Sequence, residues 1–315
     1  MRVLVTGGAG FIGSHLSERL LGLGHEVVCL DNFNGFYDPA VKRANVAQAL
    51  LSPRYTLLEG DILDATLLDR VFATPFDAVA HLAAYAGVRP SIEQPGLYQR
   101  VNVEGTLNLL ERCRAACVPR LVFASSSSVY GGRTYVPFRE TDDVSRPISP
   151  YAATKLGGEA LCHAYHHLFG TGVHCLRFFT VYGPRQRPEM AIHLFASAMC
   201  AGRPVRMFGD GSSSRDYTYI DDIVDGVVAS IERCAGFEIL NLGGRSATSL
   251  AELVALIGRA LGVTPRVERM PDQPGDVPLT FADVDKAARV LGYRPKVGIE
   301  EGIGLFCDWL KVRPR

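Results

Sequence analysis

The chain has 315 residues, 47% of them hydrophobic, and its 33 basic side chains balance 33 acidic ones. This composition excludes a disordered or fibrous protein. The zero net charge excludes nucleic acid as the main partner, because phosphate backbones are met with a basic surplus, and no apolar run reaches the ~18–20 residues that span a membrane.

The eight cysteines are scattered and form no Cys-x-x-Cys pair. The first residues pass straight into a glycine cluster and leave no room for a signal peptide. We therefore expect reduced thiols in a cytoplasmic protein, with no membrane partner and no bound metal.

Short apolar runs alternate with amphipathic stretches in the first half of the chain. This predicts an α/β fold with a doubly wound parallel sheet. The expected strands are Arg2–Thr6, Glu26–Leu30, Tyr55–Glu59, Ala78–His81, Leu121–Ala124 and Val173–Arg177, and the expected helices are Phe11–Leu23, Asp64–Phe72, Tyr98–Ala116 and Tyr151–Phe169.

From about Gly183 proline and glycine become denser, which predicts a smaller and less regular lobe. We place the sheet domain at residues 1–182 and the lobe at 183–315, with a chain that crosses between them more than once. Helices are expected at Ala191–Ala201, Asp221–Cys234, Ser249–Leu261, Asp283–Leu291 and Ile299–Leu310, with Ser249 and Asp283 as N-caps.

A glycine motif joins the first strand to the first helix. Gly7, Gly10 and Gly13 have the spacing of a tight turn that lets the backbone approach a pyrophosphate, which then lies over the helix N-terminus. Phe11 and Ile12 lie within the motif and are also expected to contact the cofactor. A purely structural glycine turn is the alternative.

Asp31 follows the second strand, 18 residues after Gly13, near the position of the acidic residue that binds adenosine ribose. A carboxylate repels a 2′-phosphate, so NAD is favoured over NADP. Asp61 and Ile62 could meet the adenine or simply end the third strand. Further candidates for cofactor contact are Asn32, Asn34, Leu82, Ala83, Ala84 and Asn102.

Two features predict a reactive centre. Four serines, residues 125–128, follow a central strand at the sheet edge where open α/β sheets bind ligands. Tyr151 and Lys155 are one turn apart on a helix that Ser149 and Pro150 can begin. A nearby ammonium and a cationic nicotinamide favour the phenolate, which takes the proton of a substrate alcohol as hydride leaves to NAD. An inert loop and an inert helical pair are the alternatives.

Over essentially the whole chain, the order of these motifs resembles the extended short-chain dehydrogenase/reductase family. The resemblance implies a Rossmann-type sheet with a C-terminal α/β lobe that binds a nucleotide sugar. It also implies that Tyr151 is the acid/base and that Lys155 is its modulator and a ribose anchor. Ser126 or Ser128 then polarises the substrate oxygen.

Within that family, the serine cluster separates the chemistries. Dehydratases carry Asp and Glu where Ser127 and Ser128 stand, and decarboxylases carry Glu at the second position, so neither elimination nor decarboxylation fits. A cluster that contains only serines is similar to the corresponding segment of the 4-epimerases. Stretches most similar to UDP-glucuronate 4-epimerases are Asp31–Pro39, Ala83–Arg89, Phe178–Pro184 and Arg187–Ala191.

The implied reaction is C4 epimerisation of a UDP-hexuronate with tightly bound, recycled NAD. Thr180 and Arg187 are expected to hold the C6 carboxylate. Other expected substrate contacts are Arg89, Ser127, Ser128, Arg185 and Met190 for the sugar or nucleotide, Arg206, Phe208 and Arg215 for uracil and pyrophosphate, and Gln273 and Asp276 for ribose and phosphate. Many relatives have Arg in place of Gln273, so this loop departs from the pattern.

Other activities stay open at this point. They are a UDP-glucose 4-epimerase, a C5 epimerase and a catalytically silent NAD-bound sensor. The resemblance also implies a homodimer that pairs through the helices at Tyr98–Ala116 and Tyr151–Phe169.

Overall fold

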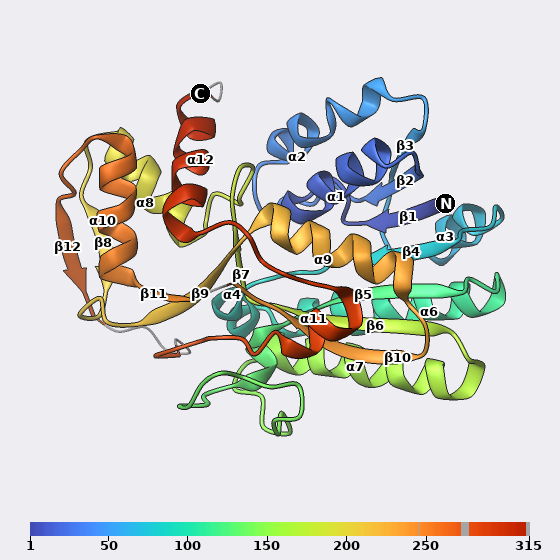
Figure 1. The fold of residues 1–315 in the computed structure, drawn as a ribbon. Coiled ribbons are helices and arrows are strands. Elements are labelled where there is room, and N and C mark those ends of the chain that lie inside the picture. The colour runs from blue at the N-terminus through green and yellow to red at the C-terminus, as the bar shows by residue number, and fades with distance from the viewer. Residues whose placement is uncertain (245, 272–276, 313–315) are drawn as a thin grey trace.

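The computed structural model describes residues 1–244, 246–271 and 277–312. In this part of the chain, seven parallel strands form one sheet in the order β10-β6-β5-β4-β1-β2-β3 (Figure 1). Their bounds are β1 Arg2–Thr6, β2 Glu26–Asp31, β3 Tyr55–Glu59, β4 Ala78–His81, β5 Arg120–Ser126, β6 Gly172–Phe178 and β10 Phe237–Leu242. The predicted doubly wound parallel sheet is confirmed.

Helices cover both faces of the sheet, because alternate side chains of β1 are buried against helices on opposite faces. Val3 and Val5 belong to a buried cluster with Leu16 of α1, whereas Leu4 belongs to another cluster with Leu109 of α6. The continuous apolar character of the strands follows from this two-sided burial. The covering helices are α1 Phe11–Gly22 and α9 Ile220–Arg233 on one face, and α3 Ala65–Val71, α6 Gly105–Ala115 and α7 Pro150–Phe169 on the other.

Shorter helices were less visible in the sequence. α2 (Pro39–Val46) begins with Asp38, whose side chain accepts a hydrogen bond from the Ala40 N–H, and with proline at its first position. The helix expected at Tyr98–Ala116 is divided by a π-helical turn before α6. The remaining short elements of this region are α4 Val88–Glu93, α5 Pro95–Gln99, the π turn η2 Arg100–Glu104, and the 3₁₀ turns η1 Ala49–Leu51 and η3 Ser127–Tyr130.

A second lobe carries short strands and separate helices (Figure 1). In the described residues it has a sheet of three strands, β11-β9-β7, and one of two, β12-β8. The strands are β7 Thr180–Tyr182, β8 Val205–Phe208, β9 Ser214–Tyr219, β11 Ala247–Ser249 and β12 Val267–Met270, and the helices are α8 Ala191–Cys200, α10 Leu250–Leu261 and α12 Ile299–Val312.

The chain returns to the large sheet after first leaving it. α9 packs on α1, β10 pairs with β6, and α11 (Asp285–Leu291) packs on both α9 and β10. A boundary between residues 182 and 183 therefore divides the chain in sequence but does not separate the two lobes in space.

Some local predictions need correction. Ser249 caps α10 as expected by accepting from the Glu252 N–H. The N-cap of α11 is Val284 and not Asp283, whose carboxylate accepts from the Asp285 N–H and from Arg139 Nε. β10 was not predicted, although four of its six residues are apolar, because the chain has already entered the region assigned to the second lobe.

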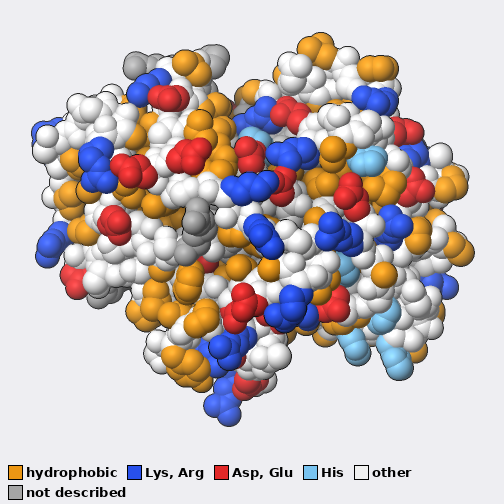
Figure 2. Space-filling model, in the orientation of Figure 1, with side chains coloured by type: hydrophobic (Ala, Val, Ile, Leu, Met, Phe, Trp, Pro, Cys, Tyr) orange, Lys and Arg blue, Asp and Glu red, His pale blue; other side chains and the backbone are white. Residues whose placement is uncertain are grey.

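The surface agrees with the balanced composition. On the face in Figure 2, acidic and basic side chains are interspersed. No helix in the described ranges is long and apolar enough to cross a membrane. All eight cysteines lie within those ranges and are free, with Cys117 and Cys200 exposed and the rest buried.

Candidate active site

The glycine turn lies between β1 and α1 at the carboxyl edge of the sheet. Gly7 has φ +67°, and a Cβ there would lie 2.7 Å from the Ala83 nitrogen. A Cβ on Gly13 would lie 2.3 Å from the Gly7 oxygen. Glycine is therefore required for the turn and for the close packing beneath it. Gly10 is the N-cap of α1, so the helix N-terminus opens onto the adjoining cavity.

That cavity has a volume of about 370 Å³ and runs from the glycine turn to the serine cluster and the start of the second lobe. Most of the residues predicted to bind cofactor or substrate line it. They are Gly7, Gly10, Phe11, Ile12, Gly13, Asp31, Asn32, Asn34, Asp61, Ile62, Leu82, Ala83, Ala84, Ser126, Ser127, Ser128, Tyr151, Lys155, Thr180, Arg187 and Met190.

Asp31 is buried at the end of β2. Its carboxylate accepts from the Ala9 N–H at 3.2 Å, from the Phe33 N–H at 2.9 Å and from Lys42 Nζ at 3.2 Å. Lys42 was not anticipated, because its helix α2 was not predicted. Since this ammonium lies against the carboxylate, repulsion by Asp31 alone does not decide between NAD and NADP.

The neighbouring polar residues bind one another. Asn32 Nδ2 donates to Asp61 Oδ2 at 2.7 Å, and Asn32 Oδ1 accepts from the Asn34 N–H at 3.0 Å. These contacts join the ends of β2 and β3 into one wall of the cavity.

Asn102 has a different position from the other cofactor candidates. It is buried outside the described cavity lining, and its amide bonds the backbone N–H and C=O of Tyr85 and the Thr154 hydroxyl. Tyr85 does line the cavity. Asn102 thus fixes the loop after β4 against α7.

Tyr151 and Lys155 face the serine cluster from α7. Ser149 caps this helix by accepting from the Ala152 N–H at 3.1 Å. Tyr151 and Ser126 line the same part of the cavity, and Ser126 is near enough to affect the ionisation of the phenol. Lys155 Nζ donates to the Ala124 oxygen at 2.8 Å and lies 6.0 Å from the centre of the Tyr151 ring. The two motifs that the sequence separates by 25 residues therefore meet.

Burial dominates the ionisation of this pair. It raises the pKa of Tyr151, while the neighbouring hydroxyl of Ser126 and the positive charge of Arg187 lower it. Burial lowers the pKa of Lys155 to about 8. We expected the ammonium of Lys155 to favour the phenolate, whereas the protein groups found to do so are Ser126 and Arg187.

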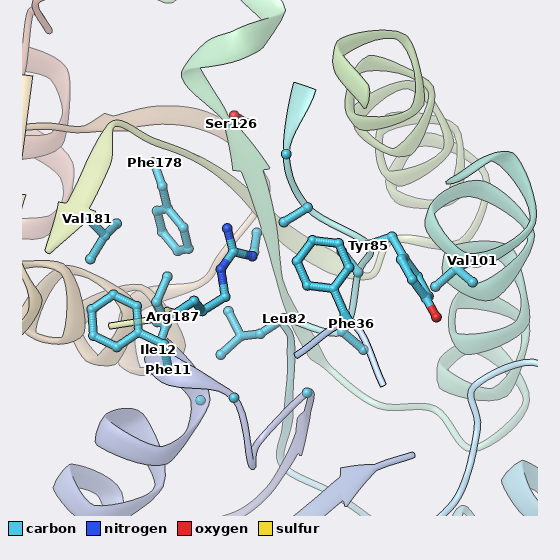
Figure 3. Close-up of a pocket in the computed structure, with 18 of the residues that line it drawn as sticks. Phe11, Ile12, Phe36, Leu82, Tyr85, Val101, Ser126, Phe178, Val181 and Arg187 are labelled. Carbon is cyan, nitrogen blue, oxygen red and sulfur yellow. The ribbon is translucent and has the colours of Figure 1, made fainter. Parts of the chain in front are cut away.

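Arg187 enters the cavity from the segment after β7. In Figure 3 it extends between Phe178 on one side and Leu82 and Phe36 on the other. Its guanidinium carbon lies 5.6 Å from the Phe36 ring centre, and its Nε forms an ion pair with Glu189 Oε1 at 2.8 Å.

Other predicted substrate residues do not line this cavity within the described chain. Arg185 pairs with Glu18, and Arg206 lies 3.8 Å from Glu268. The Arg89 guanidinium lies 5.2 Å from the Phe208 ring, and Arg215 Nη1 donates to the Ser214 oxygen. Gln273 and Asp276 lie outside the described residues.

Several lining residues were not proposed from the sequence. They include Phe36, Tyr37, Lys42, Tyr85, Val101, Phe178, Phe179 and Val181. Part of the signal was present, because Phe36 and Tyr37 belong to the stretch Asp31–Pro39 that carried the resemblance, and Tyr85 belongs to Ala83–Arg89.

Comparison with known proteins agrees with this geometry. A family model described as NAD dependent epimerase/dehydratase matches residues 3–243. A UDP-glucuronate 4-epimerase of Thermodesulfobacterium geofontis is 42% identical over 310 residues, which cover 98% of this chain and 95% of that protein.

Solved structures extend the likeness. The UDP-glucuronic acid 4-epimerase of Bacillus cereus, in complex with UDP-glucuronic acid and NAD, has a TM-score of 0.91 and 38% identity, and 99% of each chain is covered. The UDP-glucose 4-epimerase of Thermotoga maritima, with UDP-glucose, has a TM-score of 0.92 and 33% identity over 99% of each chain. The chain therefore belongs to the NAD dependent epimerase/dehydratase family.

Proposed function

We propose that the protein interconverts UDP-glucuronate and UDP-galacturonate by NAD-dependent epimerisation at C4. One observation carries the proposal: a single cavity brings the glycine turn, the Tyr151–Ser126 pair and the Arg187 guanidinium together. The relatives named as UDP-glucuronate 4-epimerases support the same substrate.

The cavity wall fits a dinucleotide. The glycine turn leaves no space for side chains between β1, α1 and Ala83, so the backbone itself faces the cavity. The α1 N-terminus would hold the pyrophosphate, and Asp31 with Asn32 would hold the adenosine ribose. When bound, NAD supplies reversible hydride transfer.

Tyr151 is placed to move the proton of the sugar's C4 hydroxyl. Ser126 lies beside the phenol side chain and would hold the substrate oxygen. Tyr151 takes the proton as C4 is oxidised to a ketone. The 4-keto sugar then rotates in the cavity to present its other face, and Tyr151 returns the proton to the C4 oxygen as C4 is reduced. Lys155, tied to the end of β5, would hold the nicotinamide ribose.

The sugar end of the cavity fits an acidic sugar. Arg187 offers a cation there and Thr180 a hydroxyl, with Ser127 and Ser128 beside Ser126. In the described lining the carboxylates are Asp31 and Asp61, both at strand ends on the glycine-turn side. A wall of hydroxyls beside Ser126 suits oxidation and re-reduction and offers no acid for elimination.

The UDP group would extend toward the second lobe. We propose that its contacts are Arg206 and Phe208 on β8 and Arg215 on β9. Arg89, which lies over Phe208, is a further proposed contact. A homodimer and a cytoplasmic location also stay predictions.

The direct test is competition. The purified protein is given equal amounts of UDP-glucuronate and UDP-glucose, and the products are separated by chromatography, with a Tyr151→Phe preparation as the blank. We expect UDP-galacturonate to form first. Preferential formation of UDP-galactose would reject the acidic substrate, and no product from either sugar would reject catalysis.

A further inference from the structure

The segment that carries Arg187 is attached to α1, the helix whose N-terminus faces the glycine turn. Arg185 Nη2 donates to both carboxylate oxygens of Glu18, at 2.9 and 3.1 Å, and its Nη1 lies 3.4 Å from the Ser14 hydroxyl. One step earlier in the chain, His15 Nε2 bonds the Pro184 oxygen at 2.9 Å. We call these contacts between residues 14–18 and 184–185 the α1 latch.

The backbone of this segment is held in an unusual shape. Arg185 has φ +65°, a left-handed conformation that is unfavourable for a non-glycine residue and persists only where its surroundings fix it. Gln186 closes the turn, because its side chain donates to the Val181 oxygen and its N–H donates to the Gly183 oxygen.

The histidine contact has a defined polarity. Burial and the neighbouring Arg185 lower the pKa of His15 to about 4. The ring is therefore neutral near pH 7, and since a carbonyl only accepts, Nε2 must carry the proton. The α1 latch thus consists of the charged hydrogen bonds between Arg185 and Glu18 and the neutral hydrogen bond from His15 to Pro184.

Arg185 itself lies outside the described cavity lining, while Arg187, two residues later, lies inside it. We propose that Arg185, clamped to Glu18, is a positioning residue that sets where Arg187 presents its guanidinium, and so a determinant of selectivity for an acidic sugar. The inference rests on the proposed function, because it assumes that Arg187 meets the substrate's carboxylate.

The test uses the NAD-loaded enzyme and several variants. Glu18→Gln removes the negative charge that pairs with Arg185. Arg185→Gly removes the clamp while placing at this position the residue that best adopts a positive φ, so the fold is preserved. Arg185→Lys retains a positive charge opposite Glu18, so it should restore part of the effect lost in Arg185→Gly. Asp225→Asn is the matched control, since Asp225 pairs with Arg19, the next residue of α1, and not with the segment 183–187.

Calorimetry gives the Kd for UDP-glucuronate and UDP-glucose, and kinetics give KM and kcat. In Glu18→Gln and Arg185→Gly we expect Kd and KM for UDP-glucuronate to rise roughly threefold to tenfold, with kcat changed by less than about twofold. The values for UDP-glucose should stay constant, the control should resemble wild type, and Arg185→Lys should recover part of the affinity.

Equal weakening for both sugars would show that the clamp only joins the lobes, and unchanged affinities would show that it does nothing for Arg187; either result overturns the inference. If Glu18→Gln fails to fold, Arg185→Gly alone decides. Wild-type enzyme that does not epimerise UDP-glucuronate would instead contradict the proposed function, and that failure is seen without any variant.

Discussion

The two ends of the cavity are built differently. At the glycine-turn end, polar groups follow parallel strands and bind partners at neighbouring strand ends, as Asn32 after β2 does with Asp61 after β3. At the sugar end, Arg187 lies on a short irregular segment held by side chains of a distant helix.

Cofactor binding and substrate selectivity therefore depend on different kinds of contact. Regular strands fix the glycine-turn end, so its chemistry depends on the fold as a whole. The sugar end depends on a few tertiary contacts, so selectivity can change there while the fold and the reaction are retained. Substitutions at the two ends should therefore have separable effects on turnover, affinity and stability.

Tyr151→Phe should strongly reduce turnover for either sugar. Removing the acid/base should lower kcat by roughly 10² to 10⁴, because that is the usual contribution of a positioned proton carrier. Steady-state kinetics with UDP-glucuronate and UDP-glucose measure it. Tyr135→Phe is the control, since Tyr135 is 66% exposed. Near-normal turnover in the Tyr151 variant would refute its role.

Arg187→Met should affect the acidic sugar alone. Loss of a charged hydrogen bond should raise Kd for UDP-glucuronate between roughly tenfold and a hundredfold. Calorimetry on both sugars is the measurement, and Arg203→Met, an exposed arginine, is the control. If binding of UDP-glucose weakens as much, Arg187 serves the nucleotide and not the carboxylate.

Acid should weaken the fold beneath the glycine turn. His81 is buried between the hydroxyls of Thr6 and Thr106, and burial lowers its pKa from 6.5 to about 3. The unfolded chain binds a proton below pH 6.5 while the folded chain does not, so stability is lost as pH falls through that window. Between pH 7 and 5 this costs about 2 kcal/mol.

Urea unfolding at pH 7 and pH 5 measures this cost. His81→Gln should lose less stability than wild type across the interval, whereas His167→Gln, which replaces an exposed histidine, should behave as wild type. An equal loss in wild type and His81→Gln would contradict the assignment.

Asp31→Asn should weaken cofactor retention by about tenfold, the effect of about 1.4 kcal/mol. The amide cannot accept from all the groups that Asp31 now satisfies, and it no longer balances Lys42. The NAD content of the purified protein and the Kd for added NAD measure it, with Glu59→Gln, which breaks the exposed pair with Arg43, as control. Unchanged retention would show that Asp31 only holds α2.

The parts of the site that could be predicted from the sequence are those that local pattern fixes. Gly7, Gly13 and Tyr151 lie at a strand–helix junction or at a capped helix start, where short-range spacing determines their positions. Six of the seven strands of the parallel sheet follow for the same reason, because each is a short, mostly apolar run next to a helical pattern.

The rest depends on contacts that no short window contains. Lys42 reaches Asp31 through α2, a helix whose only signals are Asp38 and Pro39. Asn102 and Arg185 were predicted to bind ligands because of their residue types, yet tertiary partners occupy their side chains. The return of β10 to the sheet edge is likewise a long-range pairing.

The central claim is that C4 is oxidised and reduced again within one cavity. UDP-glucuronate carrying deuterium at C4 tests it most directly, with product analysed by NMR and mass spectrometry. We expect UDP-galacturonate that retains the deuterium at C4 and that gains none when unlabelled substrate reacts in heavy water. Loss of the label from C4, or incorporation of solvent deuterium at C5, would contradict it.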